Sequence, residues 1–303
     1  MMLGSSAAPP PTPTKSWYPT RIPLMFLLQC WALEGSRIES HHSCTNRMVC
    51  SHIHEISYLG DVLLAFTFVA FSAACILFAL VSSRAEDKKP EKQKFYLVVL
   101  LANAVCAAAY FAMLGGQGWT VSASCRQMFS IRYLSWIVSA PLIITALGFI
   151  ACVELYEILT VCASSALSFF CLYAAANSLE NVKWVWFLVA LGTATHVMAS
   201  LFRSYRYSME LAPANVAALY RQLMFLTVGC NIAYLFFWIL CDGSGAVSVG
   251  VEAFLFAVTD MASRIVFGAI LLSNRAVIDR VASSESSYGS ISECVALPLP
   301  ATL

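Results

Sequence analysis

Asp260 and Arg264 are the residues of this chain whose types and spacing are most informative about chemistry. Both lie inside the last strongly apolar segment, FLFAVTDMASRIVFGAILL (254–272). A charge at the centre of a membrane-spanning helix costs about 2.5–3.5 kcal/mol on insertion scales, so it normally faces a protein interior and has a partner. Residues four positions apart are neighbours on one face of a helix. The sequence therefore predicts a buried ion pair. Because arginine keeps its proton, one member of the pair is a fixed cation.

The composition is typical of a membrane protein. Of the 303 residues, 59% are hydrophobic and 12% are charged, whereas charged residues make up about 25% of a soluble domain. Several apolar runs approach the length of about 20 residues that crosses a bilayer as a helix. The net charge of +1 argues against nucleic acid as a partner. No nucleophile–base pair, phosphate loop or metal cluster is visible, so we do not expect an enzyme.

The apolar runs predict an all-α membrane protein, a bundle of seven transmembrane helices. We expect them at roughly 57–83, 95–115, 129–152, 155–177, 184–203, 218–241 and 249–273. The loop after the first helix is rich in Lys and Arg, and the loop before the last helix has none. Because basic loops stay on the cytoplasmic side, we expect the C-terminus in the cytosol and the N-terminus outside, in the plasma membrane. The expected organisation is an extracellular segment (1–56), a seven-helix domain (57–280) and a disordered cytoplasmic tail (281–303).

The N-terminal segment leaves alternatives open. Residues 21–36, RIPLMFLLQCWALEGS, combine basic residues with a short apolar run of signal-peptide length. The other interpretation is an extracellular segment that packs against the bundle or lies on the membrane. Cys44 and Cys50 could form a disulfide in this external segment, and an intermolecular bridge is equally compatible with the sequence. The nearby histidines match no standard zinc spacing, so we expect no metal.

Four ordered motifs carry a resemblance to a known family. They are RYLSWIVSAPL (132–142), KFYLVVLLANAVCAAAYFAML (94–114), CNIAYLFFWIL (230–240) and GAVSVGVEAFLFAVTDMASRIVFGAILLSNRAV (245–277). Across residues 57–280 the chain resembles the microbial (type 1) rhodopsins. The resemblance implies a seven-helix bundle in which a lysine of the seventh helix binds retinal as a protonated Schiff base.

The chain departs from the family at the chromophore. The resemblance places Arg264 at the position of the Schiff-base lysine, and a guanidinium is not a practical Schiff-base nucleophile. It places Ser135 where pumps carry a carboxylate, and Ala146 where proton pumps often carry a donor acid. Asp260 and Arg132 match the remaining counterion positions. We therefore expect no covalent cofactor, although non-covalent retinal stays open.

The predicted retinal pocket is half preserved. Tyr110, Trp136, Ser139, Tyr234 and Trp238 match pocket positions of the family. The resemblance also indicates that Asn231 replaces a tryptophan that covers the polyene, and that Leu235 replaces a proline.

On the external side, Asp242 and Glu252 match proton-release positions, together with Arg132. The alternative is that these residues are ordinary helix-end and loop charges. The same geometry would place Asp260 between Arg264 and Arg132, which gives two cations for one anion. We therefore expect a pocket that is either wet or entered by something negative.

Two functions remain open after these departures. The first is a retinal-independent, opsin-related membrane protein with a regulatory or stress-linked role. The second is a light-sensing or ion-conducting rhodopsin, a photoreceptor or channel that uses non-covalent retinal or a pigmented partner subunit. The lipid bilayer is an expected partner in both, and a homo- or hetero-oligomer is compatible with either.

Overall fold

The computed structural model describes residues 53–84, 90–122, 125–209 and 212–288. The chain divides into two units, residues 1–44 and 45–303, and every described residue lies in the second. The signal-like stretch 21–36 and the cysteine pair Cys44 and Cys50 lie outside the described residues.

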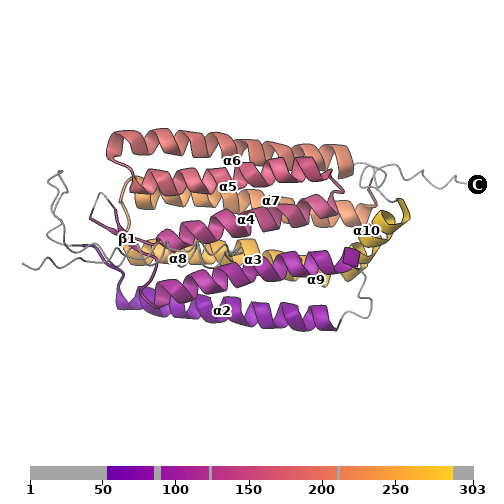
Figure 1. Cartoon of the computed structure of the whole chain (residues 1–303), viewed down its shortest axis with the longest axis horizontal. Coiled ribbons are helices and arrows are strands. Elements are labelled where there is room, and N and C mark those ends of the chain that lie inside the picture. Colours follow the sequence, from indigo (N-terminus) through magenta and orange to yellow (C-terminus); the bar gives the residue numbers. More distant parts are fainter. Residues whose placement is uncertain (1–52, 85–89, 123–124, 210–211, 289–303) are drawn as a thin grey trace, which may run out of the picture. The chain divides into compact units, whose positions relative to one another are not determined.

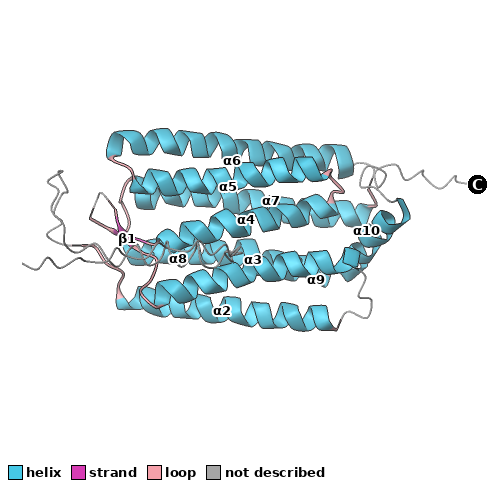
Figure 2. Cartoon of the chain, in the orientation of Figure 1, coloured by secondary structure: helices cyan, strands magenta, loops and turns pink. Residues whose placement is uncertain are grey.

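The described part is a bundle of long helices that run side by side (Figures 1 and 2). The helices are α2 (Tyr58–Ser83), α3 (Pro90–Leu114), α4 (Ser130–Ile150), α5 (Leu155–Asn177), α6 (Glu180–Met209), α7 (Ala214–Trp238), α8 (Val249–Met261), α9 (Phe267–Ser273) and α10 (Arg275–Tyr288). Within the described ranges, seven helical segments are long and apolar enough to cross a membrane. The predicted seven-helix bundle is confirmed, and this is an integral membrane protein.

Two helices contain a turn of π-helix. η1 (Ile239–Gly243) continues α7, and η2 (Ala262–Val266) joins α8 to α9. Each such turn holds an extra residue in the helix, and π-turns are frequent at functional sites. Arg264 lies within η2.

Sequential neighbours pack together from α2 to α6, and α8 packs against both α2 and α7. α8 thus closes the bundle between α2 and α7. Trp136 and Trp238 are among the largest fully buried side chains, and Arg132 and Arg264 are buried with them. The interior therefore holds both the aromatic residues and the charges that the sequence analysis selected.

A small hairpin precedes α4, which the sequence analysis did not predict. β1 (Thr120–Val121) pairs antiparallel with β2 (Gln127–Met128), and a parallel bridge joins His54 to Arg126. Cys125 in the hairpin turn is disulfide-bonded.

The tail differs from the expectation of disorder from residue 281 onward. α10 continues as helix to Tyr288, and it packs against α3 and α7. Val277, Ile278, Val281 and Ala282 are buried, so the reason is an apolar face that the polar composition of this stretch conceals. Lys92 of α3 also forms a salt bridge of 2.9 Å with Asp279.

Candidate functional site

Asp260 and Arg264 form the centre of the site. The Oδ1 atom of Asp260 lies 3.4 Å from Nη1 of Arg264, and both side chains are 1% exposed. The predicted buried ion pair is therefore present. It lies where α8 passes into the π-turn η2.

The Asp260 carboxylate is held by three further donors from three other helices. The Tyr110 hydroxyl of α3 donates to Oδ2 at 2.7 Å. The indole of Trp136 in α4 donates to Oδ1 at 2.7 Å, and the Tyr234 hydroxyl of α7 donates to Oδ1 at 2.5 Å. Hydrogen bonds to a charged acceptor are about twice as strong as neutral ones. The carboxylate thus ties α3, α4 and α7 to α8.

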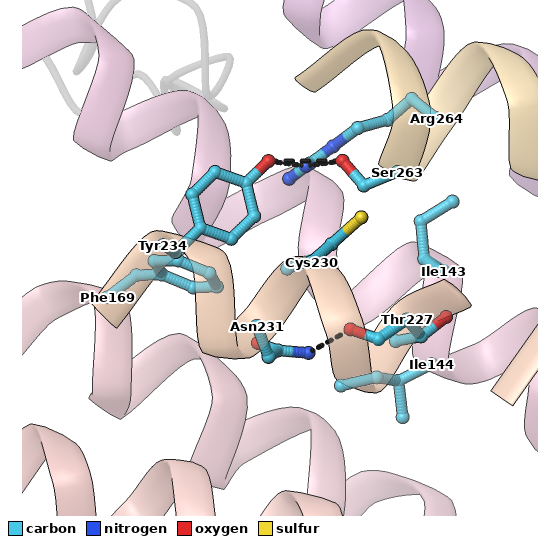
Figure 3. Close-up of a pocket in the computed structure, with 10 residues that line it drawn as sticks. Ile143, Ile144, Phe169, Thr227, Cys230, Asn231, Tyr234, Ser263 and Arg264 are labelled. Carbon is cyan, nitrogen blue, oxygen red and sulfur yellow. Dashed lines mark hydrogen bonds between the residues drawn. The ribbon is translucent and has the colours of Figure 1, made fainter. Parts of the chain in front are cut away.

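The guanidinium of Arg264 has a partner at each nitrogen. Nε and Nη2 donate to the Ser139 hydroxyl of α4 at 3.2 and 2.8 Å. Nη1 donates to the Tyr234 hydroxyl and to the hydroxyl of the adjacent Ser263, and Figure 3 shows these two groups meeting at the guanidinium. The positive charge is therefore fixed in place by hydroxyl groups as well as by Asp260.

Asn103 supports the backbone beside this charge. Its amide nitrogen donates to the carbonyl of Val99 at 2.8 Å and approaches the carbonyl of Arg264 at 3.5 Å. Both contacts are buried; the first lies within α3, and the second joins α3 to η2. Sequence reasoning missed Asn103 and Ser263. Both lie inside motifs that carried the resemblance, 94–114 and 245–277, but neither was assigned a role there.

A cavity of about 20 Å³ adjoins Arg264. Its wall includes Ile143, Ile144, Phe169, Thr227 and Asn231 (Figure 3). A cavity needs about 10–15 Å³ to hold one water molecule, so there is room here for a water and for nothing much larger.

The predicted retinal-pocket residues are divided between the ion pair and the cavity, and the ring centroids of Trp136 and Tyr234 are 4.9 Å apart. Asn231 and Tyr234 line the cavity, and the Asn231 amide donates to the Thr227 carbonyl at 3.0 Å. Tyr110 and Trp136 donate to Asp260, as Tyr234 also does. Trp238 is buried and stacks on Phe187, with ring centroids 5.1 Å apart.

The two remaining counterion positions do not complete the Asp260–Arg264 pair. Ser135 is buried, but its hydroxyl donates to the carbonyl of Arg132 at 2.7 Å. Arg132 forms its salt bridge with Glu252, at 2.6 Å. Arg132 is therefore paired with Glu252, and among the described residues its salt bridge is not with Asp260.

A second charged cluster lies toward the hairpin. The Glu252 carboxylate, which is fully buried, accepts from Arg132 and from Arg126, which directly precedes β2, both at 2.6 Å. Arg126 also donates to the carbonyl of Val247. The Tyr133 hydroxyl donates to Asp242 in η1, the π-turn that continues α7.

This cluster settles two points of the sequence analysis. Glu252 is not an ordinary helix-end charge, because it is buried between two arginines. The predicted excess of cations is also wrong, since Arg126 and Glu252 were not counted. The two clusters together hold Arg126, Arg132 and Arg264 beside Asp242, Glu252 and Asp260, which is three arginines with three carboxyl groups. A charged residue in the short loop before α4 was the available signal for Arg126.

Residues 60–278 match the family described as Bacteriorhodopsin-like protein. This match covers more than half of the chain.

The chain belongs to the bacteriorhodopsin-like protein family.

Relatives of this bacteriorhodopsin-like protein include Archaerhodopsin-1 of Halorubrum ezzemoulense, 28% identical over 66% of this chain and 79% of the relative. Bacteriorhodopsin of Halobacterium salinarum is 26% identical over 66% of this chain and 78% of its own length. Among solved structures, the thermophilic rhodopsin of Rubrobacter xylanophilus superimposes with a TM-score of 0.70 at 26% identity, covering 74% of this chain and 99% of that one. The light-driven proton pump of Coccomyxa subellipsoidea has a TM-score of 0.69 at 22% identity, covering 73% and 99%.

Proposed function

We propose that this bacteriorhodopsin-like protein works without retinal, as a regulatory or stress-linked membrane protein rather than as a light-driven pump. The observation that carries the proposal is Arg264. Its guanidinium stands where the resemblance puts the Schiff-base lysine, and every one of its nitrogens already has a partner. No reactive amine is available there for a carbonyl compound.

The space beside Arg264 supports the same conclusion. Pockets for small organic ligands are about 300–1,000 Å³, and the cavity here is about 20 Å³. Non-covalent retinal would have to displace Ile143 and Ile144, which are buried in the core with exposed fractions of 3% and 4%. The rival function is therefore less well supported than the retinal-independent one.

The residues at the pump positions also favour this proposal. A pump must hold groups that gain and lose a proton during its cycle. Arg264 keeps its proton, and the Ser135 hydroxyl is bonded to its own helix. Ala146 is buried and has no group to titrate. The resemblance places the proton-transfer groups at these positions, and this chain has none of them there.

For the location we propose the plasma membrane, with the N-terminus and the hairpin outside. The distribution of Lys and Arg supports this orientation. The disulfide at Cys125 supports it too, because disulfides persist in oxidising compartments and are rare in the cytosol.

The first test is an absorption spectrum of the purified full-length protein before and after addition of all-trans retinal, with borohydride reduction and peptide mass analysis. We expect no visible band and no retinyl adduct on α8, η2 or α9. A bacteriorhodopsin treated in the same way is the positive control, and it shows that the added retinal can bind. A visible band or an adduct would overturn the retinal-independent assignment.

The second test concerns the role. Cells that lack the protein should grow less well under membrane stress such as heat or ethanol, and the wild-type chain should restore growth in the dark without retinal. Restoration that requires light or retinal would contradict the proposal. Unchanged growth of the deletion strain would exclude the stress-linked part of it.

A further inference from the structure

Ser283 carries a hydroxyl group that belongs to neither charged cluster. It lies on α10, at one end of the bundle (Figure 1), and its side chain is exposed. The hydroxyl donates to the carbonyl of Asp279 at 2.6 Å. Arg280 is also exposed, and residues three positions apart are neighbours on one face of a helix. An accessible hydroxyl with an arginine beside it is the pattern by which one class of serine kinases selects its substrates.

Two polar contacts join α10 to the bundle within one helical turn of Ser283. Asp279 forms the salt bridge of 2.9 Å with Lys92 of α3. Arg280 donates from Nη1 to the amide oxygen of Asn215 in α7, also at 2.9 Å. These two residues lie four and three positions before Ser283, so a charge added to Ser283 acts on both contacts. They flank the apolar face by which α10 is buried against α3 and α7.

We propose that Ser283 is a phosphorylation site and that its modification releases α10 from α3 and α7. In a serine kinase the Ser283 Oγ atom attacks the γ-phosphorus of ATP. An O–P bond forms, the bond from the γ-phosphorus to the β,γ-bridging oxygen breaks, ADP leaves, and the hydroxyl proton passes to the catalytic base of the kinase. The inference names a regulation for the proposed regulatory protein. In cells it rests on the proposed cytosolic C-terminus, and it does not depend on retinal.

The phosphate opposes the docked position of α10 in three ways. It carries a charge of about −1.5 to −2 at neutral pH, and like charges one helical turn apart, here with Asp279, destabilise a helix. It attracts the Arg280 guanidinium, which can bind a phosphate through two N–H groups, away from Asn215. The ester oxygen also has no proton, so the hydrogen bond to the Asp279 carbonyl is lost. We therefore expect α10 to open more often after modification.

Ser83 is a matched control on another helix. It ends α2 and is exposed, and its hydroxyl donates to a carbonyl of its own helix, that of Leu80, at 2.9 Å. The residue three positions before it is this leucine rather than an arginine, so a kinase that requires the arginine should leave Ser83 unmodified. Ser83→Glu adds a negative charge without placing it beside the contacts of α10.

The experiment treats the purified full-length protein, in detergent micelles, with ATP and a serine kinase that selects an arginine three residues before its target. Peptide mass analysis should find phosphate on Ser283, and less of it in Arg280→Gln. Amide hydrogen exchange, which reports local opening, should become about threefold to thirtyfold faster in α10, the range for one lost hydrogen bond and one unfavourable charge pair. Exchange in α5 should not change. Ser283→Glu should reproduce part of the effect, Ser283→Ala less of it, and Ser83→Glu none.

Ser283 that stays unmodified, or that is modified only after denaturation, would overturn the site. Phosphorylated protein in which α10 exchanges at the unmodified rate would overturn the release. Equal acceleration in Ser83→Glu or in Ser283→Ala would also overturn it, since neither the position nor the charge would then matter. Micelles expose both ends of the bundle to the kinase, so these outcomes are independent of the proposed orientation. Antibody labelling of an epitope on the C-terminus in intact and permeabilised cells tests the orientation separately.

Discussion

Replacing Asp260 by asparagine removes the negative charge at the centre of the bundle with little change of shape. The carboxylate accepts hydrogen bonds from Tyr110, Trp136, Tyr234 and Arg264. After the substitution the buried guanidinium has no anion beside it. Loss of one member of a buried pair costs about 3–5 kcal/mol. We expect the free energy of unfolding of Asp260→Asn to fall by about this amount.

A double variant gives a sharper test, because the effect of Arg264→Met on the free energy of unfolding should change sign between the two backgrounds. In the wild-type background Arg264→Met should destabilise the protein, since it leaves the carboxylate of Asp260 unpaired. In the Asp260→Asn background the same substitution should stabilise it, since it removes the uncompensated cation while the amide oxygen still accepts from neighbouring donors. The coupling energy between the two sites should be about 3 kcal/mol, at the upper end for residues in contact.

The assay is reversible unfolding in mixed detergent micelles, followed by far-UV circular dichroism. Asp61→Asn on the exposed start of α2 is the control and should lie within about 0.5 kcal/mol of the wild type. The reasoning is refuted if Asp260→Asn unfolds like the wild type. It is also refuted if the effects of the two substitutions simply add.

Three further predictions concern the hairpin and the last helix. Cys125→Ser should lower the free energy of unfolding by about 2–4 kcal/mol, and peptide mapping without reductant should show Cys125 linked in the wild type; an unlinked thiol would contradict this. Arg126→Gln should cost about 1–3 kcal/mol in the same unfolding assay, because Glu252 loses a charged donor while buried; no change would mean that the Arg132 contact suffices. Ile278→Ala should cost about 2–5 kcal/mol as a cavity in the core and should speed tryptic cleavage within α10; unchanged cleavage would show that α10 is held by other contacts.

The helices could be predicted from the sequence because membrane spans have a strong signal. The predicted segment 155–177 coincides with α5, Leu155–Asn177, and the predicted 249–273 coincides with the run from Val249 to Ser273. The ion pair could be predicted for a different reason. Two opposite charges at helical spacing in an apolar segment have few possible partners other than each other.

The remainder of the site could not be predicted from the sequence, because it depends on contacts across the bundle. The resemblance grouped Arg132 with Glu252, but the two are 120 positions apart, so sequence spacing could not predict the salt bridge between them. Arg126 lies in a hairpin of two-residue strands, which is too short to leave an alternating pattern. The helical tail was missed because serines near its end hide the apolar face that holds Ile278 against the bundle.

The contacts of Arg264 bear on how this position can evolve. Its planar fork binds Ser139 through two nitrogens and reaches Tyr234 and Ser263 through the third. A lysine would bring one ammonium group on a flexible stem, and exchange of arginine for lysine is not conservative at such a site. Natural selection for folding alone would therefore retain arginine here, whatever the cell gains from the protein. A lineage that carries this network would have to cross a less stable intermediate before it could acquire a pigment-binding residue, so the network makes the present state of the site hard to reverse.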